Sequence, residues 1–183
     1  MGRMKKRTLC ILAGGFEEIE TVTPIDLLRR ANIEVVVAAV GANLQVTGRS
    51  GITLVADRSL DDALASGDFD SLLIPGGPAV GALRKDGRTA NLARDFHAEG
   101  KLIAAICAAP LVLHDAGLLD GRRFTAHASV RDELPGALDD RVVEDGTIIT
   151  SRGAGTAVDF SLAIITALAG AAAADEVAQA ILA

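Results

Sequence analysis

Short apolar runs alternate with amphipathic stretches along most of the chain. Thr8 to Leu12 is a β-rich run that ends at Gly14 and Gly15, and the stretch from Ile19 to Arg30 follows it. That stretch predicts an amphipathic helix, with apolar residues at Ile19, Val22, Ile25, Leu27 and Leu28. The mostly β-branched run from Ile33 to Val40 is typical of a parallel strand that helices cover on both faces. These segments together predict a βαβ unit.

The same alternation continues to the C-terminus. Further strands are expected over 52–55, 72–74 and 102–106, and Asp145-Gly146 predicts a tight hairpin between 141–143 and 147–150. Helices are expected over 89–99, after Pro110, over 153–168 and over 175–182. We therefore predict an α/β fold with one doubly wound, mainly parallel sheet sandwiched by helices. Residues 1–183 are expected to form a single domain, with residues 1–6 as a flexible N-terminal tail.

Composition narrows the class of protein. Half of the 183 residues are apolar, and the net charge of −6 is spread over interspersed acids and bases. No basic stripe or aromatic platform is present to bind nucleic acid. The basic N-terminus lacks the long apolar run of an export signal, and no apolar stretch approaches the roughly 20 residues that span a bilayer. We expect a soluble, cytoplasmic protein with Cys10 and Cys107 as free thiols.

Cys107 is the first candidate for chemistry. It lies where a buried strand meets a helix, and Ala105 and Ala109 supply the small residues that a nucleophile elbow needs two positions before and after the nucleophile. A thiol near a helix N-terminus is expected to have a lowered pKa, below the usual value of about 8.5. The same pattern also fits a cysteine that is only a small hydrophobic residue at the end of a buried strand. We interpret Cys10, in the middle of the first strand, as such a buried hydrophobic residue.

Other polar groups follow strands at the same predicted edge of the sheet. Glu20 lies in the Glu-Glu-Ile-Glu segment after the first strand, where acids commonly serve the helix dipole or face solvent. Pro75-Gly76-Gly77 ends another strand, and glycine there lets backbone amides approach a ligand. His127 lies in an irregular region that can fold back over the thiol and act as a general acid or base. His97 and His114 are expected to be incidental, and no spacing indicates a metal site.

Four segments together resemble the DJ-1/PfpI superfamily, on its DJ-1/YajL/ThiJ-like branch: 13–30, 73–77, 104–110 and 150–156. The resemblance covers nearly the whole chain and is most specific in the sequences Ala-Ile-Cys-Ala-Ala-Pro and Glu-Glu-Ile-Glu-Thr-Val. It implies a flavodoxin-like, or class I glutamine amidotransferase-like, fold. It also implies a homodimer and no cofactor.

The resemblance further implies roles for individual residues. Cys107 corresponds to the reactive, oxidation-prone cysteine of the family, and Glu20 to the protonated glutamic acid that hydrogen-bonds its sulfur. The backbone amides of Gly77 and Ala108 correspond to an oxyanion hole. His127 matches a histidine that bacterial relatives do not always carry. Arg29 and Arg49 match arginines near the dimer interface, where they are candidates for an anion site.

Two functions follow from the resemblance. The first is a cofactor-independent glyoxalase or deglycase, in which Cys107 forms a hemithioacetal with a 2-oxoaldehyde such as methylglyoxal or acts on early glycation adducts. The alternative is a redox sensor or chaperone in which Cys107 is oxidised. A plain binding or scaffold dimer is a third class. A peptidase is disfavoured, because the peptidase branch has a histidine directly after the cysteine, where Ala108 stands.

Overall fold

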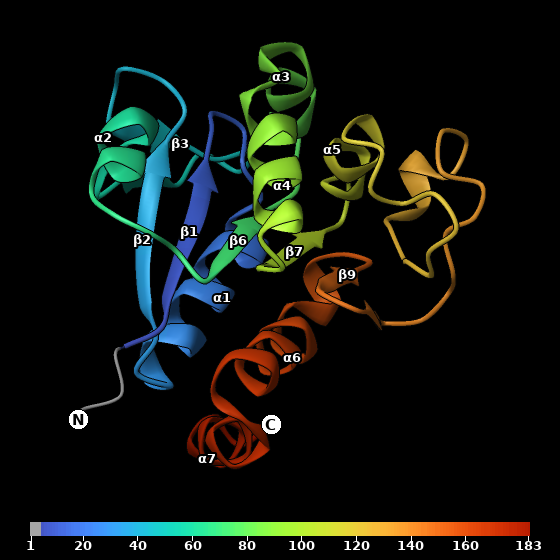
Figure 1. The fold of residues 1–183 in the computed structure, drawn as a ribbon. Coiled ribbons are helices and arrows are strands. Elements are labelled where there is room, and N and C mark those ends of the chain that lie inside the picture. The colour runs from blue at the N-terminus through green and yellow to red at the C-terminus, as the bar shows by residue number, and fades with distance from the viewer. Residues whose placement is uncertain (1–4) are drawn as a thin grey trace.

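Residues 5–183, the part of the chain that the computed structural model describes, are built around a seven-stranded sheet (Figure 1). Its strands are β1 (Arg7–Leu12), β2 (Glu34–Ala39), β5 (Arg58–Ser59), β6 (Ser71–Ile74), β7 (Leu102–Ile106), β8 (Val142–Asp145) and β9 (Ile148–Ser151). The order across the sheet is β5-β2-β1-β6-β7-β9-β8. All neighbouring strands are parallel except β8 and β9. The predicted α/β class and mainly parallel sheet are confirmed.

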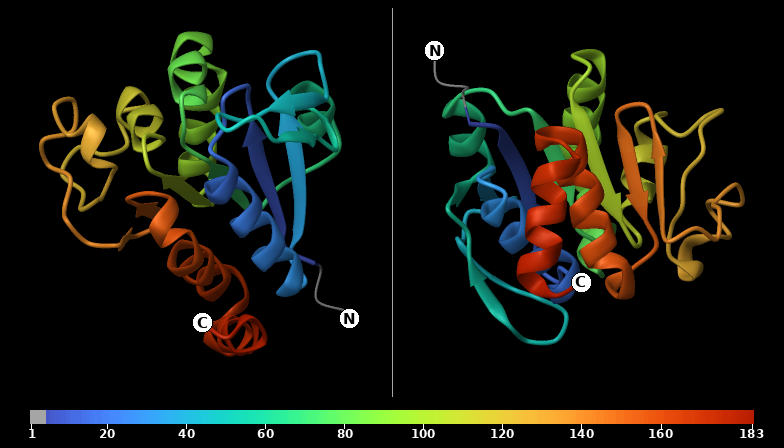
Figure 2. Two further views of the ribbon diagram at one scale, coloured as in Figure 1. Left: turned by 180° about the vertical axis from the view of Figure 1, so that it is seen from behind. Right: turned by 90° about the horizontal axis from the view of Figure 1, so that it is seen from below.

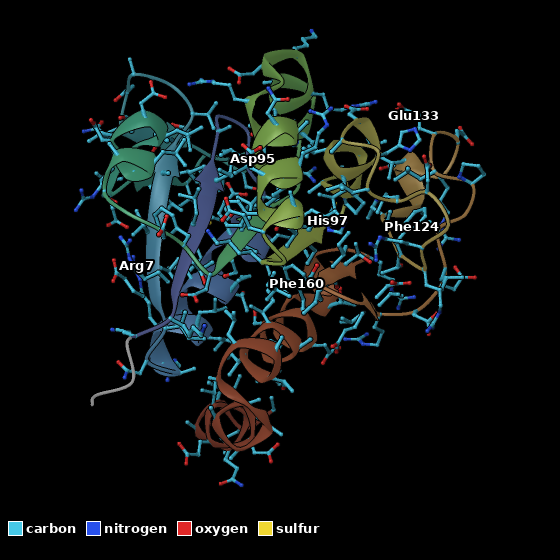
Figure 3. The ribbon with its side chains drawn as sticks, in the orientation of Figure 1. Arg7, Asp95, His97, Phe124, Glu133 and Phe160 are labelled. Carbon is cyan, nitrogen blue, oxygen red and sulfur yellow. The ribbon has the colours of Figure 1, made fainter. Side chains whose placement is uncertain are left out.

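Helices cover both faces of the sheet (Figures 1 and 2). One face packs against α1 (Glu18–Arg30), α6 (Ala157–Ala169) and α7 (Ala171–Ile181). The other packs against α2 (Leu60–Ala65), α3 (Ala79–Asp86), α4 (Arg88–Ala98) and α5 (Pro110–Asp115). Phe160 of α6 is fully buried against the first of these faces (Figure 3).

Side chains of β1 alternate between the two layers of the core. Leu9 and Ile11 belong to the cluster on the α4 side, whereas Cys10 and Leu12 belong to the cluster on the α1 side. This is the period-two pattern of a strand that is buried on both faces. Cys10 has no exposed surface, and burial raises the pKa of its thiol to about 12, so it is an inert core residue as predicted.

Several predicted elements are confirmed within a residue or two, including β7, α4 and the hairpin of β8 and β9. The helix predicted over 153–168 begins instead with a 3₁₀ turn, η2 (Ala154–Thr156), and α7 begins at Ala171, four positions before the predicted start. The predicted strand at 52–55 is β4 (Thr53–Val55), which pairs with the unpredicted β3 (Gln45–Thr47) in a separate two-stranded sheet.

The interpretation of α1 as a simple amphipathic helix is partly wrong. Leu27 and Leu28 are buried as expected, but the side chains of Ile19 and Val22 are 54% and 44% exposed. The buried face at the start of α1 holds Glu20 instead, which is only 1% exposed. An acidic residue thus takes a core position, and two apolar residues are left on the surface.

At the N-terminus, residues 1–4 of the expected tail lie outside the described residues. Lys6, the last residue of that segment, contacts the sheet through an ion pair of 2.6 Å with Asp70, and its carbonyl accepts a bond from the Glu34 amide. None of the helices in residues 5–183 combines the length and apolarity needed to cross a membrane.

Candidate active site

Four turns meet at one edge of the sheet. They follow the carboxyl ends of β1, β6, β7 and β9, which are consecutive neighbours in the sheet order. The turn after β1 leads to Glu20, the turn after β6 contains Gly76 and Gly77, β7 is followed by Cys107, and β9 is followed by Gly153. This is the edge where open parallel sheets bind ligands, so the sequence-predicted residues lie where the fold favours a site.

Cys107 adopts the strained conformation that a nucleophile elbow requires. Its φ angle is +66°, in the left-handed region that non-glycine residues rarely adopt. Two bonds hold its backbone: its amide donates to the Ser151 carbonyl at 2.8 Å, and its carbonyl accepts from the His127 amide at 2.9 Å. α5 begins three residues later, at Pro110. This conformation agrees with the elbow that the small residues around Cys107 predict, and a left-handed φ angle of this kind costs about 1–3 kcal/mol.

Glu20 faces this thiol from the first turn of α1. Its amide donates to the carboxylate of Glu17, the N-cap residue, at 2.8 Å, which fixes the start of the helix. Its Oε2 accepts a hydrogen bond of 3.1 Å from the Gly76 amide, and its carboxyl group lies close enough to the side chain of Cys107 for each group to shift the pKa of the other. The structure therefore brings together the two residues that the sequence analysis ranked first.

Burial changes the proton affinity of both partners. It raises the pKa of Glu20 to about 7. With Glu20 ionised, burial and repulsion by that carboxylate raise the pKa of Cys107 to about 12. The expectation of a thiol pKa below 8.5 is therefore wrong for the state with ionised Glu20. When Glu20 holds the proton, the repulsion vanishes and its hydroxyl can donate to the sulfur, so the two groups titrate as one pair.

Backbone amides also face the sulfur. Those of Gly77 and Ala108 lie near Cys107 and act to lower the pKa of its thiol. These are the two amides that the resemblance assigns to an oxyanion hole, and that role stays a prediction. Gly77 has a φ angle of +91°, which favours glycine.

Gly76 is a site residue whose importance the sequence analysis did not identify. A Cβ atom on Gly76 would lie 2.5 Å from Oε2 of Glu20 and 2.6 Å from Cβ of Cys107. No side chain fits between the two groups. The signal in the sequence was the Pro-Gly-Gly turn after β6, but it does not tell which of the two glycines touches the pair.

His127 lies beside this pair on a loop. A Cβ atom on Gly153 would lie 3.3 Å from Cδ2 of His127 and 3.9 Å from Oε1 of Glu20, so Gly153 separates the imidazole from the carboxyl group. Nδ1 of His127 accepts the amide hydrogen of Ser129 at 3.2 Å. The neutral imidazole therefore carries its proton on Nε2 and is a donor at that atom. His97 and His114 lie on α4 and α5.

The arginines expected near a dimer interface lie far apart in one chain. Arg29, in the last turn of α1, donates to the carbonyl of Val35 and pairs with Asp57 at 3.3 Å. Arg49 lies near the other end of α1, where its amide donates to the carbonyl of Phe16 and its charge lowers the pKa of Glu20. The 13 residues of α1 span about 20 Å, so the two arginines do not form one anion site within the chain.

Glu18, another acid of the Glu-Glu-Ile-Glu segment, is buried in the first turn of α1. It is 7% exposed, and its Oε1 accepts the amide hydrogen of Ser50 at 2.7 Å, which connects α1 to the turn between β3 and β4. This hydrogen bond helps to lower the pKa of Glu18 against the opposing effect of burial. Among residues 5–183, no cluster of histidine, cysteine, aspartate and glutamate has the arrangement of a metal site.

Comparison with known proteins gives consistent matches over nearly the full length. A family model described as the DJ-1/PfpI family matches residues 6–167. Protein DJ-1alpha of Drosophila melanogaster is 42% identical over 182 residues, which are 97% of this chain and 84% of the relative. The Parkinson disease protein 7 homolog of Danio rerio is 39% identical, with 94% of each chain covered. The crystal structure of Drosophila melanogaster DJ-1beta superposes with a TM-score of 0.93 at 40% identity and covers 98% of both chains.

Proposed function

The chain belongs to the DJ-1/PfpI family, and we propose that it is a stress-response glyoxalase or deglycase that uses Cys107 as its nucleophile and needs no cofactor. The observation that carries this proposal is the close approach of the buried Glu20 carboxyl group to Cys107 across Gly76, with the amides of Gly77 and Ala108 near the same thiol. A nucleophile, a proton carrier and two oxyanion donors around one atom are what addition to a carbonyl group requires.

The proposed reaction begins with the pair in the state in which Glu20 holds the proton and Cys107 is the thiolate. The sulfur adds to the aldehyde carbon of a 2-oxoaldehyde, so that a carbon–sulfur bond forms and negative charge moves to the aldehyde oxygen. The amides of Gly77 and Ala108 stabilise this oxygen until it takes a proton and becomes the hydroxyl of a hemithioacetal. Glu20 supplies that proton and is left as a carboxylate.

Glu20 then acts as the base. It removes the proton from the former aldehyde carbon, which gives an enediol(ate) across the two carbons, and returns a proton to the neighbouring ketone carbon. The hydroxyl proton of the hemithioacetal moves to the former ketone oxygen, so the first carbon becomes the oxidised thioester carbonyl and the second the reduced carbinol within one molecule. No external oxidant is needed. The product is a thioester of a 2-hydroxy acid on Cys107, and water cleaves it to release the acid and the thiol. With a pKa of about 7, Glu20 can both give and accept a proton near neutral pH.

In this proposal His127 is a hydrogen-bond donor rather than a base. Its Nδ1 is occupied by the amide of Ser129, so only the protonated Nε2 is free to bind a substrate oxygen. Loss of His127 should therefore weaken substrate positioning more than proton transfer.

Turnover of methylglyoxal by the purified protein tests this proposal. We expect lactate as the product, no turnover by Cys107→Ser, and a kcat at least about a hundredfold lower for Glu20→Gln, because an amide cannot carry the proton. Cys10→Ser is the matched control and should keep normal turnover. An inactive wild-type protein, or a Glu20→Gln variant with normal turnover, would reject the glyoxalase mechanism.

Redox sensing is the second candidate function. Cys107 is the one partly exposed thiol among the described residues, and Glu20 can donate a hydrogen bond to an oxidised sulfur. We expect mild peroxide to add oxygen to Cys107 and to leave Cys10 intact, as peptide mass spectrometry would measure. If oxidation reaches both cysteines equally, or only Cys10, this function is rejected.

We also propose a cytoplasmic homodimer. The support is an apolar surface formed by Ile19 and Val22 of α1 together with Ile52, which are 54%, 44% and 55% exposed. The hydrogen bond from the Ser50 amide to Glu18 holds the turn that carries Ile52 next to α1. Three large apolar side chains close together favour burial by a second copy of the chain.

A further inference from the structure

A basic pocket of about 550 Å³ opens beside the candidate active site. His127 and Gly153 form part of its wall. Gly153 lies next to both His127 and Glu20, because a Cβ atom on Gly153 would be 3.3 Å from the His127 ring and 3.9 Å from Oε1 of Glu20. The amide of His127 donates to the carbonyl of Cys107 at 2.9 Å, so this wall of the pocket adjoins both residues of the Glu20–Cys107 pair.

The pocket is lined by Arg131, Arg141, Arg152 and one acid, Asp139, although the chain as a whole has a net charge of −6. Asp139 pairs with Arg131 at 2.6 Å, and Arg141 pairs at 2.6 Å with Asp159. For Arg152, no carboxylate of residues 5–183 lies within ion-pair distance. The pocket therefore keeps one positive charge that the described side chains do not neutralise.

Arg152 occupies a defined position at the sheet edge. It directly follows Ser151, the last residue of β9, whose carbonyl accepts the Cys107 amide. One of its terminal nitrogens, Nη1, donates to the main-chain carbonyl of Asp139 at 2.9 Å, which fixes the guanidinium and leaves its other donors available.

We propose that this pocket binds the anionic substituent, a phosphate or a carboxylate, of the substrate whose aldehyde carbon Cys107 attacks. The inference rests on the proposed function and narrows its substrate class from 2-oxoaldehydes in general to those that carry a negative charge. Arg152 supplies the charge-assisted hydrogen bonds, since a guanidinium matches the paired oxygens of both anions.

Three substrates separate the sources of the anion: neutral methylglyoxal, the carboxylate dioxovalerate and hydroxypyruvaldehyde phosphate. We expect the kcat/KM ratio of a charged substrate to methylglyoxal to fall about tenfold in Arg152→Gln, because a charge-assisted hydrogen bond is lost. Arg58→Gln, on the exposed edge strand β5, is the matched control and should not change the ratio. The charged substrate whose kcat/KM ratio falls more identifies the anion, phosphate or carboxylate, that the pocket binds. An unchanged ratio for both would overturn the inference.

A binding measurement keeps this inference separate from the proposed function. If the protein turns over none of the three aldehydes, the glyoxalase proposal fails, and separate titrations of inorganic phosphate and of acetate in a calorimeter decide about the pocket. Saturable binding to the wild type that weakens about tenfold in Arg152→Gln would support the anion site. Equal binding to both proteins, or no binding to either, would reject it. Circular dichroism of the variant verifies that its fold is intact.

Discussion

The carboxyl group of Glu20 faces the side chain of Cys107 across Gly76, although the two residues come from opposite halves of the chain. Glu20 lies on the helix after β1, and Cys107 directly follows β7. Between these strands lies β6, so the turn after β6 has to pass between the two side chains. Gly76 occupies that position and leaves no room for a Cβ atom. The order of the strands therefore brings Glu20 and Cys107 together, and the missing side chain of Gly76 leaves room for their contact.

Thiolate absorbance tests which residue of the Glu20–Cys107 pair carries the negative charge. In the proposed state Glu20 keeps the proton, so the first proton lost comes from Cys107. We expect absorbance to rise with a midpoint at or below about 7, the pKa to which burial raises Glu20. The rise should vanish in Cys107→Ala and persist in Cys10→Ala. A transition that survives in Cys107→Ala would show that another group produces it.

The raised pKa of Glu20 predicts a pH-dependent stability. Its folded value of about 7 exceeds its ordinary value of 4.5, so between these pH values the folded protein binds more protons than the unfolded chain. The stability from the proton that the Glu20–Cys107 pair holds is complete below pH 4.5 and is lost as pH rises through about 7. We expect a loss of about 3 kcal/mol over this range, measured as the free energy of unfolding of wild type relative to Glu20→Gln.

Glu144→Gln is the control for that experiment, because Glu144 is an exposed residue of β8. The difference between wild type and this variant should not depend on pH. A difference between wild type and Glu20→Gln that is constant from pH 4 to 8, or that grows as pH rises, would contradict the assignment of the shift.

Gly76→Ala should disable the site without a change to either reacting residue. The new methyl group would lie 2.5 Å from Oε2 of Glu20 and 2.6 Å from Cβ of Cys107, so the two groups must separate. We expect a loss of about 1–3 kcal/mol in unfolding free energy and the disappearance of methylglyoxal turnover. Gly81→Ala in α3 is the control, because nothing lies within 4 Å of the added atom. It should gain about 0.5–1 kcal/mol from helix propensity and keep activity.

The strained backbone at position 107 predicts an unusual order of stabilities. At a φ angle of +66°, glycine is less strained than alanine, so Cys107→Gly should be more stable than Cys107→Ala by about 1 kcal/mol in urea unfolding. At Cys10, inside β1, the order should be reversed, because glycine weakens an ordinary strand. The same order at both positions would argue against stored strain at Cys107.

The dimer proposal makes a prediction about mass in solution. Wild-type protein at micromolar concentration should have the light-scattering mass of two chains, and Val22→Glu should shift it to one, because a charge would enter the apolar surface. Leu64→Glu is the control, since Leu64 is 39% exposed but lies on α2, across the sheet. A wild-type monomer, or equal effects of both substitutions, would reject the proposed interface.

Sequence patterns predict the parts of the site that depend on residues close together in the chain. They do not predict the parts that form only when distant segments meet in the fold. The small residues around Cys107 identify an elbow, because strand and helix pass closely at one point of the chain. Burial of Glu20 depends on three neighbouring strands and cannot be seen in a segment that resembles an ordinary helix start. For the same reason the pattern placed Ile19 and Val22 in the core, where the carboxyl group of Glu20 lies instead.

The secondary structure shows the same contrast between local patterns and contacts of distant segments. The apolar runs of β1 and β7 identify strands without ambiguity, whereas α3 was missed because it has only eight residues, contains Gly81 and lacks a side-chain cap at its start. The sequence also indicates a helix N-terminus near the thiol but not the burial that opposes its effect on the pKa of Cys107. Local motifs therefore predict which groups react, and tertiary packing sets how strongly each one holds its proton.

The amides of Gly76 and Gly77 are adjacent in the chain, yet the first donates to Glu20 and the second lowers the pKa of Cys107. One peptide turn thus supports both halves of the proton pair. A shift of this turn would move both amides together, so the acid and the thiolate would lose support in the same event. We therefore expect any movement of the turn after β6 to lower activity through Glu20 and Cys107 at the same time.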